Sequence, residues 1–395
     1  MGDDVAWAIW HHGSMRCVMV LIVLMGCSDR GIDAGERGRL LAMRPVWIAA
    51  ARAERCPRPA LRTPVTGDAS ARLHALNDKH APEQHCIDRV RKELWNELGP
   101  CIPHQPCEPQ TLATVKPHPD LVEACAPLYA AIEEVAHASE ACAPTGGKDD
   151  DEKVGALIEL DKAVRIEVAP LAAKGQVGEA ATRVLDAMRF VDDLGRQSSV
   201  VGGVISSLVV SRLVDTLDEL AIDPHLTADE ARAIARGLDT LLASAPRWDA
   251  IMRQEQAWMA NFIGSQKQDM VPELAILETQ ARGIRRVCSG TLRDCVEHLD
   301  DVKVEGGADL KDFARQLGWR DSALAFVRMQ IELRLAPPEA CANPVQRRAI
   351  LQPWADRAVV GDEYEPVVTP PAWQRAKDDK SRPFPRVLRC VPATI

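Results

Sequence analysis

Aromatic residues are scarce in this chain, since Trp, Tyr and Phe together make up 4% of its 395 residues. Aromatic and β-branched side chains favour strands, whereas Ala and Leu, which are abundant here, favour helices. The composition therefore favours an all-α fold.

The chain also lacks an excess of positive charge. It has 48 basic and 57 acidic residues, a net charge of −9. A nucleic-acid partner requires clustered Lys and Arg, so we expect none. The segment 372–395 is basic, and we interpret it as a solvated tail or as a patch that binds anionic lipid or cell-wall polymer.

Local catalytic signatures are missing as well. The sequence contains no phosphate-binding loop, no Gly-x-Ser-x-Gly, no His-Glu-x-x-His, no dinucleotide fingerprint and no Cys-x-x-Cys. We therefore expect no cofactor, and we favour a non-catalytic scaffold or binding module. The alternative is a hydrolase whose site assembles from residues distant in sequence.

Long apolar runs are rare, and the most informative one lies near the start. Arg16 precedes an apolar stretch over 17–24, which is followed by Leu24-Met25-Gly26-Cys27. A basic residue, a short apolar run and a small residue at the cleavage point are typical of a secretory signal. The last four residues resemble the lipobox of bacterial lipoproteins.

The resemblance implies cleavage after Gly26 and lipidation of Cys27, which would anchor an exported chain to the membrane. Ser28, in place of Asp, favours the outer membrane. Asp3 and Asp4 suit a signal poorly, so translation is expected to start at Met15. The alternatives are a buried N-terminal helix or a signal cut elsewhere. The helical remainder resembles exported bacterial helical proteins only loosely.

Export determines how the cysteines are interpreted. Without Cys17 and Cys27 their number is even, which in an oxidising compartment predicts disulfides. Cys390 is expected to pair with Cys341. The candidates are Cys56, Cys86, Cys101, Cys107, Cys125, Cys142, Cys288, Cys295, Cys341 and Cys390.

Two patterns raise a metal site as an alternative. One consists of metal-capable side chains close in sequence, but without a standard zinc spacing. The other is Glu134-x-x-His137, which lacks the second copy that a di-iron bundle needs. We therefore expect no metal. The first pattern comprises His80, His85, Cys86, Cys101, His104 and Cys107.

We expect an irregular helical bundle with a small disulfide-stapled helical N-terminal region and an irregular Pro-rich C-terminal tail. The predicted parts are an upstream extension and signal peptide (1–26), a lipidated tether (27–66), a Cys-rich helical region (67–145), an acidic linker (146–154), a main helical domain (155–336) and the tail (337–395).

Within the main domain, segments 156–173 and 176–195 predict an antiparallel helical hairpin. The uncharged run 197–211 predicts a buried central helix, whose small residues allow close helix packing; the alternative is a membrane-inserting or pore-lining helix. Thr227 and Glu230 have the spacing of a capping box. Asp192 and Asp193 beside Arg196 are interpreted as a solvated helix face. The last helix, 321–335, presents Leu324, Val327, Ile331 and Leu335 inward.

Overall fold

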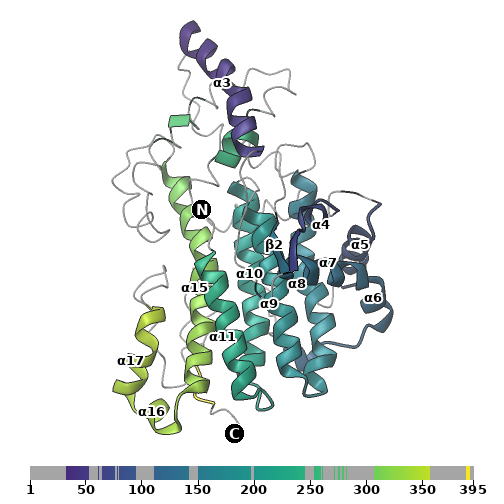
Figure 1. Cartoon of the computed structure of the whole chain (residues 1–395), viewed down its shortest axis with the longest axis vertical. Helices are drawn as coiled ribbons and strands as arrows, with labels where there is room; N and C mark the ends of the chain where they lie inside the picture. Colours follow the sequence, from purple (N-terminus) through teal and green to yellow (C-terminus); the bar gives the residue numbers. More distant parts are fainter. Residues whose placement is uncertain are drawn as a thin grey trace, which may run out of the picture.

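Long helices packed side by side form the centre of the molecule in the computed structural model (Figure 1). Helices make up 83% of the described residues, which confirms the all-α class. The structure describes 33–52, 61, 65–75, 78, 80–94, 111–141, 150–196, 200–244, 253–258, 260, five positions between 271 and 282, 307–355 and 388–391.

The central helices are α8 (Asp150–Ala173), α9 (Val177–Arg196), α10 (Val200–Ala221), α11 (Ala228–Ala243) and α15 (Gly307–Leu335). α10 lies between its neighbours and contacts α8, α9 and α15. α11 packs on α9 and α15.

The predicted hairpin of α8 and α9 is confirmed, and glycine makes its turn. Gly175 has φ of 75°, in the left-handed region that glycine enters at no steric cost. Its N–H donates to the Ala172 carbonyl (2.9 Å), and the Gln176 N–H donates to the Leu171 carbonyl (2.9 Å). These two bonds close the end of α8 as a Schellman motif.

Residues 200–211 of the uncharged run lie in α10, and most of their described side chains are buried, as predicted. Gly202, Gly203 and Ser207 are buried, and the Ser206 hydroxyl donates to the Val191 carbonyl of α9 (2.9 Å). A Cβ at Gly195 would lie 2.3 Å from that of Ser206, so the two helices touch there. Among the described residues, no helix has the length and apolarity needed to cross a bilayer.

The Cys-rich region packs on α8 and α9 as part of the same unit. It contains α4 (Ser70–Ala75), α5 (Pro82–Leu94), η1 (Leu112–Thr114), α6 (Pro119–Ala124) and α7 (Ala126–His137). The strands β1 (Val65–Asp68) and β2 (Ala138–Glu140), which the sequence did not predict, pair in parallel.

One hydrophobic core runs from Ala69 to Ile331 and includes both predicted regions. The expected hinge between them is wrong, because α8 already begins at Asp150 and its helix occupies most of the predicted acidic linker. Acidic residues suit the positive N-terminal end of a helix, so the same charges fit a helix start.

Two further boundaries need correction. The predicted tether contains the helix α3 (Ala34–Arg52), which lies at one end of the molecule (Figure 1). The first part of the predicted irregular tail forms α16 (Pro338–Ala342) and α17 (Pro344–Ala355), and α17 packs on α15.

Two disulfides occur in the described part of the chain. Cys86 of α5 bonds to Cys125, between α6 and α7, with a Cα–Cα distance of 4.7 Å. Cys341 of α16 bonds to Cys390 with a Cα–Cα distance of 5.9 Å, the pairing expected from the sequence. The first links helices of the N-terminal region, and the second ties the segment around Cys390 to the bundle.

Candidate functional site

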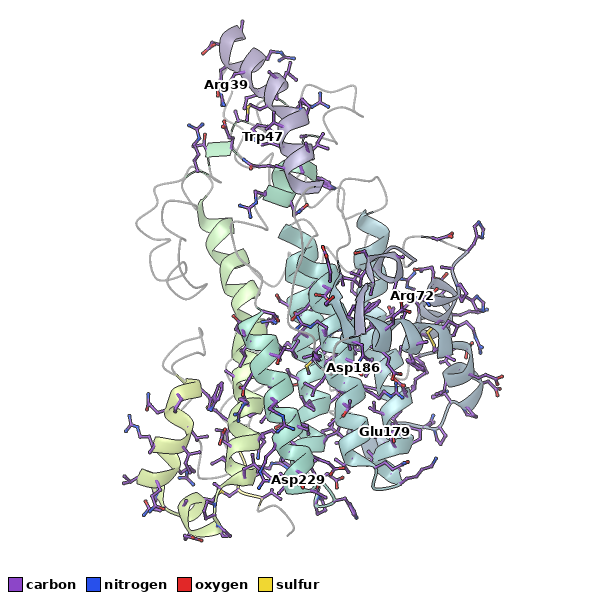
Figure 2. All side chains as sticks on the ribbon, in the orientation of Figure 1. Arg39, Trp47, Arg72, Glu179, Asp186 and Asp229 are labelled. Carbon is purple, nitrogen blue, oxygen red and sulfur yellow. A yellow bond between two sulfur atoms is a disulfide. The ribbon has the colours of Figure 1, made fainter. Side chains whose placement is uncertain are left out.

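Asp192 and Asp193 are not on a solvated face, so that prediction is wrong. Both residues are buried, with exposures of 2% and 0%. They belong to a set of charged side chains inside the bundle, of which Asp186 is labelled in Figure 2. Burying a charge is costly unless it is paired, so the partners of these groups determine what the set does.

Arg320 of α15 is the centre of this set. Its Nε donates to one oxygen of Asp192 (2.7 Å), and its Nη2 donates to the other. The Arg320 side chain is 2% exposed and that of Asp192 is 1% exposed. A two-point contact of this kind between a planar guanidinium and a carboxylate is strong and directional, and here it joins α9 to α15.

The same arginine also closes the end of α11. Its Nη2 donates to the Leu241 carbonyl (2.8 Å), which belongs to the last turn of that helix. The Ser244 hydroxyl donates to the same carbonyl (3.1 Å) and accepts from Nη1 of Arg189 (2.9 Å). Positive charge at a helix C-terminus is favourable, so Arg320 and Arg189 stabilise this end.

Arg334 repeats the arrangement on α15, fourteen positions after Arg320 in the sequence. Its Nη1 donates to the carbonyl of Ala221 (3.1 Å), the last residue of α10, and its Nη2 donates to that of Leu226. Burial lowers the pKa of the Arg334 guanidinium. Two buried arginines of one helix therefore cap the ends of two others, and we call Asp192, Arg320 and Arg334 the α15 clamp.

Electrostatics keep the Arg320 guanidinium of the clamp charged. Burial lowers the pKa of Arg320, but the carboxylates of Asp192 and Asp321 outweigh that effect, so the net shift is upward. A guanidinium with a raised pKa cannot act as an acid near neutral pH. The α15 clamp therefore holds α15 to the neighbouring helices α9, α10 and α11.

A second charged cluster lies where α7, α8 and α9 meet. Arg183 of α9 donates to Glu133 of α7 (2.7 Å), and its Nε lies 3.8 Å from Glu167 of α8. Burial raises the pKa of Glu167 to about 7, although Arg183 opposes the shift. The Glu167 side chain is 15% exposed, so this carboxyl group exchanges protons near neutral pH and remains partly accessible to solvent.

The described residues of the metal alternatives take other roles. Cys86 is in a disulfide, His80 and His85 are exposed, and Glu134 accepts from Nε of Arg72 (2.7 Å). Across the described ranges, no group of three His, Cys, Asp or Glu side chains converges as a metal site would.

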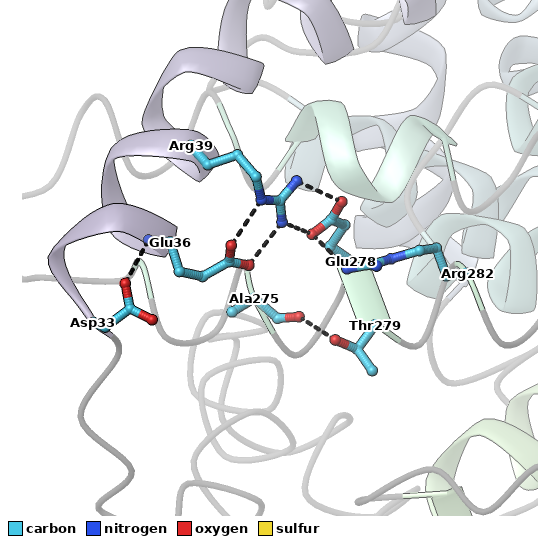
Figure 3. Close-up of polar contacts among 7 residues, drawn as sticks. All are labelled: Asp33, Glu36, Arg39, Ala275, Glu278, Thr279 and Arg282. Carbon is cyan, nitrogen blue, oxygen red and sulfur yellow. Dashed lines mark hydrogen bonds and ion pairs between the residues drawn. The ribbon is translucent and has the colours of Figure 1, made fainter.

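Polar contacts hold α3 at its end of the molecule (Figure 3). Asp33 accepts from the Glu36 N–H (2.9 Å) and caps the helix start. Arg39 binds Glu36 (2.7 Å) and both oxygens of Glu278, and Arg282 lies 3.1 Å from Glu278. The hydrogen bond from Arg39 lowers the pKa of Glu278, so the carboxylate stays ionised.

Several predicted site residues lie outside the described residues. They are Gly26, Cys27, Cys56, Cys101, His104, Cys107, Cys142, Cys288 and Cys295. Searches of protein-family models, curated proteins and solved structures find no match to this sequence. The class that the fold defines is an all-α bundle with buried arginine clamps and disulfides.

Proposed function

We propose that this chain is a lipid-anchored helical scaffold or binding protein of the bacterial cell envelope, attached through Cys27 and sorted to the outer membrane. The anchor rests on the apolar stretch before Leu24-Met25-Gly26-Cys27. The chain has no catalytic role in this proposal. Its partner is an envelope protein or polymer.

The disulfides support export. Cys86–Cys125 and Cys341–Cys390 have Cα–Cα distances of 4.7 and 5.9 Å, within the range of natural disulfides. Stable disulfides persist in exported proteins and are rare in the cytosol of most bacteria. Two bridges at separate places in the bundle therefore favour an oxidising compartment.

The α15 clamp is the observation that carries the non-catalytic role. Arg320 donates to Asp192, Asp321 and the Leu241 carbonyl, and its side chain is 2% exposed. A guanidinium committed to such contacts has no access to a substrate. This buried charged group thus stabilises the arrangement of helices, as a scaffold requires.

Metabolic labelling with an alkyne-bearing palmitate tests the anchor. The wild type should take up label and Cys27→Ala should not. Cys17→Ala is the matched control, because Cys17 leaves with the signal, and it should label like the wild type. Equal labelling of Cys27→Ala and the wild type would refute the anchor.

Crosslinking in intact cells tests the scaffold role. A scaffold should yield the same envelope partner in repeated experiments, and the yield should fall in Cys27→Ala, which is misplaced. Recovery of no partner above the background of abundant envelope proteins would contradict the binding role.

One observation favours the second candidate, an envelope hydrolase. Glu167 has a pKa of about 7 and shares Arg183 with Glu133, and a carboxyl group that titrates near neutral pH is a common general acid or base. Purified protein should then degrade cell-wall polymer, and Glu167→Gln should abolish the activity while leaving the fold intact. Absence of activity in the wild type would remove this candidate.

A further inference from the structure

The helix α3 has one face held by the rest of the fold. Leu40 is completely buried, and Met43, Trp47 and Ile48 are half-buried. Arg44 donates to the Ala260 carbonyl (3.0 Å), and Arg39 binds Glu278. The orientation of α3 is therefore fixed, and the same residues define the face that points away.

That outward face is apolar. Its residues recur at the spacing of one side of a helix. Leu41 and Val46 are 38% and 52% exposed, and with Val345 they are the large hydrophobic side chains most open to solvent in the described part of the chain. The outward residues are Gly38, Leu41, Ala42, Pro45, Val46 and Ala49, all exposed.

Positive charge borders this face. On the helical wheel Arg37 falls on one side of the apolar stripe and Arg39 on the other, and both are exposed. The α3 sequence has four arginines and one acidic residue, Glu36, in a chain whose net charge is −9. An apolar stripe with flanking Arg is the pattern of helices that lie in the headgroup region of anionic membranes.

The position of α3 in the sequence matches this pattern. Seven peptide steps separate Cys27 from Ala34, and even a fully extended chain spans only ~25 Å over that length. A lipid on Cys27 would therefore keep α3 close to the bilayer surface. In Figure 1 α3 lies at one end of the molecule, beyond the ends of the central helices, and Figure 2 labels Arg39 and Trp47 on it.

From these observations we infer that the outward face of α3 binds the surface of the anionic membrane in which Cys27 is anchored. Leu41 and Val46 enter the boundary between headgroups and acyl chains, and the positive charge that borders them faces the lipid phosphates. The contact orients the bundle on the membrane, a task that a lipid anchor alone does not perform. This inference rests on the proposed anchor for its biological setting, whereas the binding surface itself is independent of the lipid.

Vesicle flotation of unlipidated protein separates the two claims. The mature chain from residue 27, with Cys27→Ala and a conventional cleavable signal, should float with phosphatidylethanolamine vesicles that contain phosphatidylglycerol. It should bind vesicles of phosphatidylcholine alone more weakly, and added salt should reduce the binding. Absence of flotation would overturn the inference even if palmitate labelling succeeded. Flotation without labelling would leave the inference standing and remove the anchor.

Matched variants locate the surface. Leu41→Ser combined with Val46→Ser should weaken binding at least about tenfold, because two apolar side chains leave the contact. Val345→Ser is the control, an exposed valine on α17, and should bind like the parent. Equal binding of all three proteins would overturn the inference.

Two further measurements keep the result unambiguous. Hydrogen exchange at the α3 amides of the parent should slow when anionic vesicles are added, and unchanged exchange would overturn the inference without any variant. Sedimentation of the parent should show a monomer. A dimer that dissociates in the Leu41→Ser, Val46→Ser variant, without vesicle binding, would assign this face to a second copy of the chain instead.

Discussion

Removing one partner of the Asp192–Arg320 ion pair should destabilise the fold by more than is expected from the effect of replacing both partners together. Asp192→Asn keeps the shape of the side chain and removes its charge, which leaves the Arg320 guanidinium buried without its main counter-charge. Arg320→Met keeps much of the volume and leaves the Asp192 carboxylate, whose side chain is 1% exposed, in the same buried position.

The magnitude follows from burial. Breaking a buried ion pair by removing one partner costs about 3–5 kcal/mol, because a charge remains in the interior. Replacing both partners removes both desolvation costs, so the double variant should lose less than the sum of the single losses. Two unit charges ~4 Å apart at an effective dielectric constant near 20 attract by about 4 kcal/mol. We expect a coupling free energy of about 3 kcal/mol.

A second pair on the same helix is the control. Nε of Arg328 donates to Asp239 of α11 (2.9 Å), and the Asp239 side chain is 44% exposed. Exposed ion pairs couple by about 0.2–1 kcal/mol. The cycle of Asp239→Asn and Arg328→Met should therefore give a much smaller coupling. The contact of Arg328 with Trp354, 4.3 Å from its ring centroid, cancels within the cycle.

Chemical denaturation provides the measurement. Tryptophan fluorescence and far-UV circular dichroism should report the same unfolding transition for the mature chain carrying Cys27→Ala. A coupling below about 1 kcal/mol for Asp192 and Arg320, equal to that of Asp239 and Arg328, would contradict a desolvated clamp.

Further changes test other features of the fold. Glu167 has a folded pKa of about 7 against an ordinary value of 4.5, so stability should fall as pH rises between these values. Glu167→Gln should therefore raise the free energy of unfolding by up to about 3 kcal/mol above pH 7 and leave it unchanged below pH 4.5; a gain independent of pH would refute this cause. Cys86→Ser should lower the free energy of unfolding by about 4 kcal/mol, given the separation of 39 residues. Combination with Cys125→Ser should add little, and an additive loss in denaturant titrations would contradict a shared disulfide. Gly195→Ala should lower that free energy by about 1–3 kcal/mol through overpacking against α10, whereas Gly38→Ala, with open space around it, should not lower the melting temperature.

The features that depend on local sequence were predictable. The capping box of Thr227 and Glu230 is present, with Thr227 accepting from the Glu230 N–H at 3.3 Å. Leu324, Val327 and Ile331 are completely buried, as their spacing predicted. In each case the physical cause lies within a few turns of one helix, where periodicity and capping chemistry operate.

The boundaries between parts were less predictable, because tertiary contacts decide them. The acidic residues from Asp150 onward suit a solvated linker and a helix start equally well in isolation. They are helical here, and the helix that they begin packs on α5, α9 and α10. α3 resembled a tether because its sequence has Gly and Pro, whereas Asp33 caps it and Glu278, distant in sequence, binds it.

The α15 clamp is not predicted from the sequence, because charged side chains are normally expected on the exposed face of a helix. Its signal is nevertheless present in the sequence, since Arg320 and Arg334 are in phase with Leu324, Val327 and Ile331. An arginine that falls on the apolar stripe of a helix must either break the stripe or find buried partners. The carboxylate of Asp192 on α9 and the carbonyl of Ala221 at the end of α10 supply those partners. Periodicity therefore predicts that such an arginine is buried, whereas its partners depend on which helices pack together, which the pattern of one helix does not contain.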